Sequence, residues 1–379
     1  MQRTLAVVAA FVVSIALQTV AAQEPEVVGT QVLPADPLDR PVEVMPLADN
    51  SLLLDITRSG DRFIAVGERG HILISTDGRE WRQTKNVPLR STFTAVTSVA
   101  SHVWVVGHDG VIMHSADAGD HWEIQRRDPR GQPAEGVDPN DIRQGAPLLD
   151  VIFTDANHGF AIGAYALFLT TEDAGKTWTG SRINTVDSGQ VAAAEANTEA
   201  ELEDHSDNDM ESSVFSAAEL KIGMEEDAHL NAITSTGSGG FVIVGERGAI
   251  FRSRDGGKSW IRSQLPYDGS MFGVVGFEAE HVLAFGLRGH VFESTDLGES
   301  WVDVPTDTEL SLMGGTPIAG GGVVIGGANG LVLYRKEASQ PLSLSTDTAA
   351  GVIAGVVPAL EDGKWLIVGE NGVSRFKSK

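Results

Sequence analysis

The chain contains no cysteine in its 379 residues. This excludes a disulfide framework and the lipid-modified cysteine of a lipoprotein. Cations are also scarce: 28 Lys and Arg stand against 52 Asp and Glu, for a formal net charge of −24. Such acidity argues against general binding to nucleic acid or to anionic lipid surfaces. It favours solubility and attraction to basic partner surfaces.

The apolar run near the N-terminus is too short to anchor the chain in a membrane. Arg3 precedes the apolar stretch Leu5–Leu17, and small residues come directly before Gln23. A positive start, a short apolar core and a small-residue cleavage pattern are typical of a secretory signal peptide. We therefore predict that residues 1–22 are removed. The mature protein is then soluble and periplasmic or secreted, without direct membrane insertion.

What the chain does contain is a repeat. The stretch VGERGAIFRSRDGGKSW at Val244–Trp260 recurs with variations along the sequence, although the last two copies look truncated. Where nothing is inserted, the leading glycines lie about 40 residues apart, which is the period of a propeller blade. Residues 51–379 are therefore predicted to form an all-β, seven-bladed β-propeller. The seven leading glycines are Gly67, Gly107, Gly163, Gly245, Gly286, Gly327 and Gly369.

Each copy reads as strand, tight turn, strand, turn. Glycines flank the first turn, where we expect them to supply the positive φ angles of a hairpin. The second turn, S-x-D-x-G-x-x-W, is the Asp-box of sialidase-like propellers. Its aspartate can accept backbone N–H groups, and its tryptophan can wedge between sheets. We expect these residues to be structural: Asp77, Asp117, Asp173, Asp255 and Asp296, with Trp81, Trp122, Trp178, Trp260 and Trp301.

Two stretches interrupt the period, roughly Arg126–Pro147 and Thr185–Ala228. The second holds 13 Asp and Glu against the single cation Lys221. Both follow the outer strand of one blade and precede the inner strand of the next, so we predict that they emerge on the face that carries the first turns. The acidic insertion is either a solvating loop or an arm that docks on a partner.

The inner strands have a small third position, as a taper toward a central channel requires. Two copies carry Asp55 and Asp150 there instead, and this channel-lining pair could bind a cation or polar ligand, or simply be solvated. Residues 23–50 precede the first blade. They form a linker, or they close the last blade by adding a strand to it.

The repeated V-G-x-x-G-x-I-x-x-S-x-D-G-G-x-x-W resembles the photosystem II stability and assembly factor-like proteins over Leu52–Phe376. The resemblance implies a seven-bladed propeller, without cofactor or metal, that assists assembly of a membrane complex. Exported relatives in non-photosynthetic bacteria suggest a partner such as a transporter of the resistance-nodulation-division (RND) type. The family contacts clients through an arginine-rich patch. The matching turn residues, with neighbours on the same face, are Arg69, Arg247, Arg288, Asp109, Tyr165 and Tyr267.

The alternative is a sialidase-like glycoside hydrolase or a glycan-binding propeller. Sialidase chemistry needs a tyrosine nucleophile and an arginine cluster, and this chain has only three tyrosines. Metal binding has weaker support. The four histidines of the second repeat are expected to scatter over turns and faces without ligand-spaced partners. They are His102, His108, His114 and His121.

Overall fold

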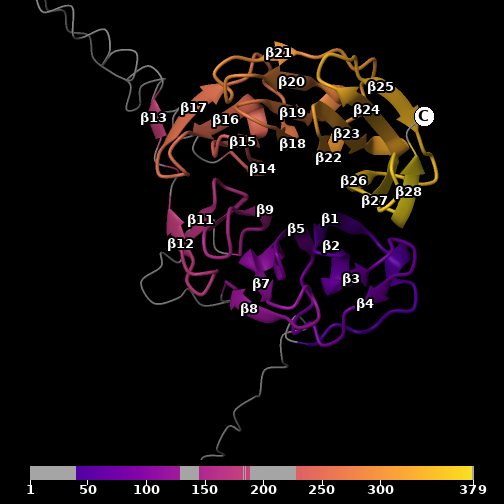
Figure 1. Ribbon diagram of the computed structural model, residues 1–379. Helices are drawn as coiled ribbons and strands as arrows, with labels where there is room; N and C mark the ends of the chain where they lie inside the picture. Colours follow the sequence, from indigo (N-terminus) through magenta and orange to yellow (C-terminus); the bar gives the residue numbers. More distant parts are fainter. Residues whose placement is uncertain (1–39, 129–144, 182, 184, 188–227, 378–379) are drawn as a thin grey trace, which may run out of the picture. The chain divides into compact units, whose positions relative to one another are not determined.

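The computed structural model describes residues 40–128, 145–181, 183, 185–187 and 228–377. The segment Pro37–Lys379 forms one compact unit. Its strands make seven sheets that follow one another around a central axis, which confirms the predicted seven-bladed propeller (Figure 1). The predicted signal peptide lies outside the described residues. No helix within the described ranges is both long and apolar enough to cross a membrane.

The first three blades each contain four antiparallel strands, numbered from the channel outward. Their bounds follow in order. Blade 1 has β1 Leu53–Ser59, β2 Arg62–Gly67, β3 Ile72–Ser75 and β4 Arg82–Gln83. Blade 2 has β5 Phe93–Val99, β6 His102–Gly107, β7 Ile112–Ser115 and β8 Glu123–Arg126. Blade 3 has β9 Leu148–Phe153, β10 Gly159–Gly163, β11 Phe168–Thr171 and β12 Thr179–Ser181.

The remaining four blades differ in strand number. Blade 4 has β14 Leu230–Ser235, β15 Phe241–Gly245, β16 Ala249–Ser253 and β17 Trp260–Gln264, with β13 Thr185–Asp187 added outside β17. Blade 5 has β18 Met271–Gly276, β19 Val282–Gly286, β20 Val291–Ser294 and β21 Val302–Asp303. Blade 6 has β22 Leu312–Ile318, β23 Gly321–Gly327, β24 Leu331–Glu337 and β25 Ser343–Thr346. Blade 7 has β26 Ile353–Pro358, β27 Lys364–Gly369 and β28 Gly372–Lys377.

The sequence suggested that the sixth repeat is truncated, but the structure gives it four strands. Its third strand, β24, runs on for seven residues, and a turn other than an Asp-box leads into β25. Only the last sheet has three described strands. Residues 40–47 pack along blade 1, where Val42 N donates to Val87 O at 3.0 Å. Most of the segment 23–50 lies outside the described residues, so closure of the last blade by that segment stays a prediction.

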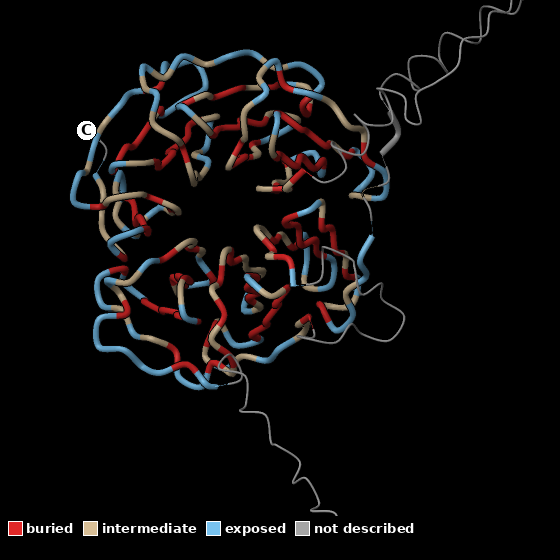
Figure 2. The backbone as a smooth tube through the Cα atoms, turned by 180° about the vertical axis from the view of Figure 1, so that it is seen from behind, coloured by how far each residue is buried: buried red, intermediate tan, exposed pale blue. Residues whose placement is uncertain are grey.

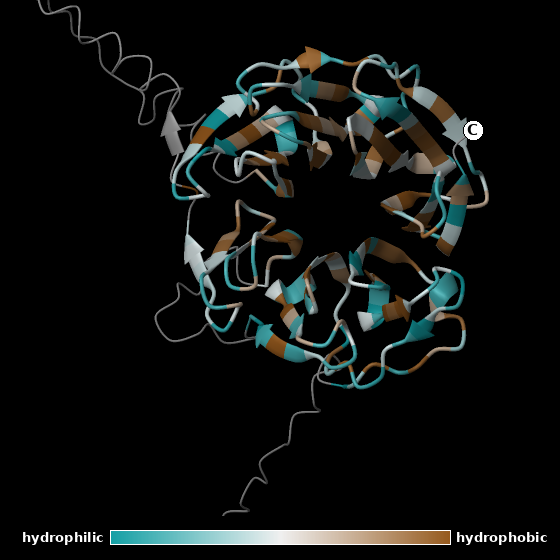
Figure 3. Ribbon diagram, in the orientation of Figure 1, coloured by the Kyte–Doolittle hydropathy of each residue, from teal (hydrophilic) through white to brown (hydrophobic). Residues whose placement is uncertain are grey.

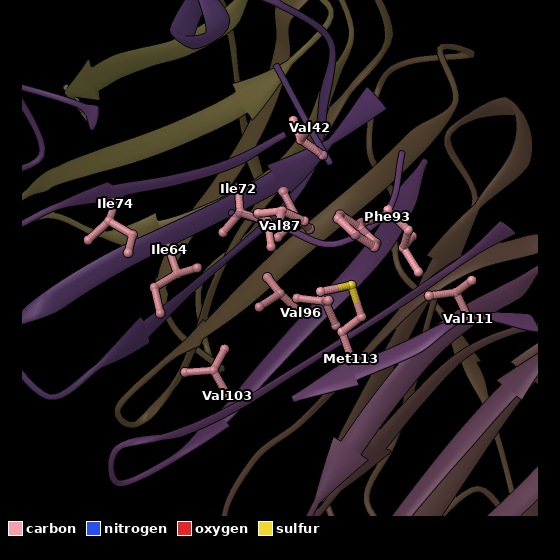
Figure 4. Close-up of a cluster of buried hydrophobic side chains, with 13 residues drawn as sticks. Val42, Ile64, Ile72, Ile74, Val87, Phe93, Val96, Val103, Val111 and Met113 are labelled. Carbon is pink, nitrogen blue, oxygen red and sulfur yellow. The ribbon is translucent and has the colours of Figure 1, made fainter. Parts of the chain in front are cut away.

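The hydrophobic core is divided among the seams of the ring. Seven clusters of buried side chains lie between neighbouring blades, and the last joins blade 7 to blade 1. Buried residues concentrate on the strands and exposed ones on the outer turns (Figure 2), and hydrophobic residues likewise lie mainly on the strands (Figure 3). Figure 4 shows the seam between blades 1 and 2, where Ile64 and Ile72 of one blade meet Val96, Val103 and Met113 of the next. Each blade thus buries its second face only against its neighbour.

The leading glycines serve a different purpose from the one predicted. Gly67, Gly107 and Gly245 have extended backbones, with φ of −174°, −176° and −150°. A Cβ on Gly107 would lie 2.1 Å from Thr92 O, and each of the seven leading glycines similarly faces the carbonyl of the residue just before an inner strand. The positive φ angles belong instead to the end of the turn, for example to Arg247 and Gly248.

Candidate docking face

Five of the first turns share one short geometry. These 3₁₀ turns join the second and third strands of blades 1, 2, 4, 5 and 6, and they define what we call the hairpin face. They are η3 Glu68–Gly70, η4 His108–Gly110, η5 Glu246–Gly248, η6 Leu287–Gly289 and η7 Ala328–Gly330. The middle residue of each adopts the left-handed conformation, and all of them except the half-buried Asp109 are exposed. These residues are Arg69, Asp109, Arg247, Arg288 and Asn329.

Blade 3 places Tyr165 in the same left-handed position, with φ of 55°. Its ring is exposed and meets the His229 ring edge-on at 5.0 Å. Glu246 of the next blade lies 3.6 Å from His229 Nδ1 and accepts the His229 backbone N–H at 3.2 Å. Through His229 and Glu246, Tyr165 therefore lies beside the turn that carries Arg247. An exposed aromatic ring next to arginine is a composition enriched at protein interfaces.

The three predicted arginines do not form one patch. Arg247 and Arg288 lie on the neighbouring blades 4 and 5, whereas Arg69 lies on blade 1, across the ring. Arg69 is also 3.9 Å from Glu68, with 71% of its side chain exposed. Tyr165, Arg247 and Arg288 lie on the first turns of the successive blades 3 to 5, and we call these three residues the Tyr-Arg arc.

The two other predicted contact residues are partly committed to the fold. Tyr267 is half-buried between blades 4 and 5. Its hydroxyl donates to Leu287 O at 3.4 Å, and its ring packs on His290 with centroids 4.0 Å apart. Asp109 is half-buried, and its carbonyl accepts the backbone N–H of Asp128 at 3.2 Å. These two residues therefore support the face more than they project from it.

The first insertion begins and ends on the hairpin face, as predicted, and the second ends there. The start of the second insertion differs from the prediction, because Thr185 pairs with Trp260 at the Asp-box end of β17. The backbone N–H of Gly145 donates to Asp128 Oδ2 at 2.9 Å, which joins the two ends of the first insertion beside the blade 2 turn. The second insertion ends at Ala228, whose carbonyl accepts the N–H of Ala166, the neighbour of Tyr165, at 3.1 Å. The residues between these ends lie outside the described part of the chain.

The Asp-boxes are structural, and they lie on the opposite face. In blade 4, Asp255 Oδ1 accepts the N–H groups of Lys258 and Ser259 at 3.0 Å, and Oδ2 accepts the Ser259 hydroxyl at 2.6 Å. Burial opposes ionisation of Asp255, but these hydrogen bonds prevail and lower its pKa to about 2. Trp260 is fully buried in the seam between blades 3 and 4. The other four Asp-box tryptophans pack at their own seams, half-buried.

The channel aspartates fasten one blade to the next. Both line a central cavity of about 380 Å³. Asp55 accepts the N–H of Val96 in blade 2 at 2.8 Å, and Asp150 accepts the N–H of Ile233 in blade 4 at 2.8 Å. Desolvation in the channel raises both pKa values to about 7, although backbone hydrogen bonds oppose the shift. These bonds give each aspartate a structural role at the channel.

Two polar networks were missed from the sequence. His102 and His114 do not scatter: His102 Nδ1 lies 2.9 Å from His114 Nε2, and Glu123 lies 3.0 Å from the other nitrogen of His114. Strand pairing brings them together from β6, β7 and β8. Between blades 5 and 6, the buried Arg335 guanidinium donates hydrogen bonds to the Glu293 carboxylate, which also hydrogen-bonds to His281. Among the described residues, no group of three or more potential ligands converges on a metal position.

Comparison with known proteins points the same way as the repeat. Residues 37–138 match the family described as photosynthesis system II assembly factor YCF48. The chain is a seven-bladed propeller that is similar to YCF48. No curated protein matches its sequence.

Solved structures confirm the fold at low sequence identity. YCF48 bound to a D1 peptide is 15% identical, with 92% of this chain and 97% of that chain covered and a TM-score of 0.58. YCF48 from Cyanidioschyzon merolae is 14% identical, with 89% and 98% covered and a TM-score of 0.59. The WD40 propeller domain of Doa1 is 12% identical, with 90% and 96% covered and a TM-score of 0.56. These likenesses show a shared architecture.

Proposed function

We propose that this propeller is a non-catalytic, exported binding scaffold that docks on a membrane protein complex through its hairpin face. The observation that carries the proposal is the Tyr-Arg arc, which lies where the acidic insertion rejoins the propeller. The YCF48 family match supports an assembly role, and one YCF48 structure holds a bound D1 peptide. A periplasmic RND-type transporter complex is the partner that we propose for this chain.

The non-catalytic assignment follows from how the tyrosines are used. Tyr165 contacts His229, and Tyr267 is packed on His290 with its hydroxyl bonded to a carbonyl. Tyr334 packs at the seam between blades 6 and 7. A sialidase nucleophile would instead need an acidic partner and a surrounding arginine cluster. The contacts of these side chains therefore favour binding over hydrolysis.

The test is a crosslinking pull-down of the tagged mature protein from the cell envelope, read by mass spectrometry. The wild type should recover one inner-membrane complex reproducibly. The Tyr165→Ala/Arg247→Glu/Arg288→Glu variant should lose that complex, because truncation and charge reversal at an interface centre weaken binding strongly.

A matched control is Lys258→Glu on the Asp-box face, which should retain the complex. Removal of residues 188–227 tests separately whether the acidic insertion contributes to capture. Equal recovery by wild type and the Tyr-Arg variant would refute docking through this arc. Turnover in a glycan screen would refute the non-catalytic assignment.

A further inference from the structure

The outer edge of the last blade differs from the others. In blade 6, β24 is paired on its outer side with β25, in the register Leu331 with Thr346 through Tyr334 with Ser343. The equivalent strand of blade 7 is β28, at Gly372–Lys377. No strand pairs with its outer side in the part of the chain that the structure describes. Its outward N–H and C=O groups are therefore a template for one more strand.

Strand addition at the rim already occurs in this molecule. β13 comes from the connection after blade 3, yet it pairs in parallel with β17 of blade 4, Thr185 with Trp260 through Asp187 with Arg262. An outer strand of this propeller thus accepts a strand from outside its own blade. The same mode of binding lets extended peptides join exposed sheet edges in other proteins, where main-chain hydrogen bonds provide affinity.

The β28 edge lacks two of the usual obstacles to pairing, a proline and a bulge. Its six residues contain no proline, and its register with β27 shows no irregularity. A bulge or a proline is what commonly protects such an edge. β28 begins at Gly372 against Asp49 and Asn50 of η2, so the stretch that can pair is Val373–Lys377.

The charged side chains beside β28 determine which kind of strand can pair with its outer edge. Arg375 and Lys377 lie on β28, and Lys364 lies opposite Lys377 on β27. Glu361 is shared by Arg375, Lys364 and Arg79, so one carboxylate serves three cations. This rim is a basic strip on a protein of net charge −24. A second copy would bring its own cations against these, whereas an acidic strand would be attracted.

We propose that the outer edge of β28 docks an extended, acidic segment of a partner protein, which joins blade 7 as its fourth strand. The proposal rests on the scaffold function and adds the chemistry of one contacting segment. The surface lies on the rim, apart from the Tyr-Arg arc. The two sites can therefore fail independently.

The probe is a short fluorescent peptide of alternating Glu and Val, titrated against the mature protein by anisotropy. It should bind, and a peptide with Lys in place of Glu should not. The Arg375→Glu/Lys377→Glu variant should weaken binding at least about tenfold, because reversed rim charges repel the peptide. The matched control Lys85→Glu/Lys258→Glu makes the same change in net charge elsewhere and should bind like the wild type.

Strand addition is separated from simple charge attraction by methylating alternate backbone nitrogens of the acidic peptide. This peptide should lose binding, and the unmethylated one should slow amide exchange at Val373–Lys377. Equal binding of the methylated peptide would overturn the proposal. So would binding that appears only after residues 23–36 are removed, since the chain's own segment would then cover the edge. The Tyr165→Ala/Arg247→Glu/Arg288→Glu variant should still bind the peptide.

Discussion

At the scale of single residues, the leading glycine of each repeat is required by space. Its φ angle is one that any residue adopts, as at Gly107 with −176°. The obstacle is the carbonyl of the residue just before the inner strand, which would lie 1.8 to 2.5 Å from an added Cβ at the seven positions. Backbone atoms cannot move aside as a flexible side chain can. The repeat therefore keeps glycine where two strands approach most closely.

We predict that Gly107→Ala lowers the free energy of unfolding by about 1–3 kcal/mol, the usual cost of overpacking. The added methyl would meet Thr92 O at 2.1 Å. Urea denaturation of the two proteins measures the difference. Gly180→Ala is the control, because its nearest neighbour, Leu169 Cδ2, would be 3.5 Å away. Equal stability of Gly107→Ala and wild type would contradict this account.

At the scale of elements, neighbouring blades are joined by polar contacts as well as by apolar seams. Arg335 of β24 is 3% exposed, and it binds Glu293 of β20 through both Nη atoms. Burial opposes ionisation of Glu293, but hydrogen bonds from His281 and Arg335 lower its pKa to about 2. The charge on Glu293 is thus tolerated only because its partners are present.

Replacing Arg335 by Met should therefore cost about 3–5 kcal/mol of unfolding free energy, since it leaves a half-buried carboxylate without its cation. The double variant Glu293→Gln/Arg335→Met removes the stranded charge and should recover most of that loss. Urea denaturation of both variants measures the effect. If Arg335→Met were as stable as wild type, the ion pair of Arg335 and Glu293 would contribute little to the free energy of unfolding.

At the scale of the whole molecule, ring closure depends on contacts between inner strands. Asp55 links blade 1 to blade 2, and Asp150 links blade 3 to blade 4, each through a backbone N–H. The equivalent positions of the last three blades are Gly273, Gly314 and Gly355. There a side chain would strike a neighbouring strand or ring, with Cβ distances of 2.3, 1.9 and 3.0 Å. One part of the channel is thus fastened by carboxylates and the other by close packing.

These aspartates make stability depend on pH. Desolvation raises both pKa values to about 7 in the folded protein, above the ordinary value near 3.9 in an unfolded chain. The folded protein binds more protons between about pH 4 and about pH 7, so the free energy of unfolding should fall as pH rises through that window. Asp55→Asn/Asp150→Asn should show a smaller fall in urea denaturation.

The control for this prediction is Asp255→Asn, since the pKa of Asp255 is about 2 and lies outside the window. That variant should keep the pH dependence of the wild type between about pH 5 and about pH 8. If the double variant also kept it unchanged, titration of the channel aspartates would not be its cause.

The repeat determined the architecture without help from the structure. A period of about 40 residues, a leading glycine and the Asp-box identify one blade, and blades can bury their faces only by stacking on one another. The same pattern located the channel positions of Asp55 and Asp150 and the face on which the first insertion begins and ends. These features are local or repeated, so sequence spacing reports them directly.

Only the tertiary structure decided which residues meet across strands and blades. Strand pairing joins His102 to His114, which are 12 residues apart, and the seam of two blades joins Arg335 to Glu293, which are 42 residues apart. β13 is added to blade 4, and β28 is an edge that no strand among the described residues covers. Both features depend on the path of connections between blades. A repeat fixes what every blade shares. Contacts particular to one seam or one edge arise only when the ring is assembled.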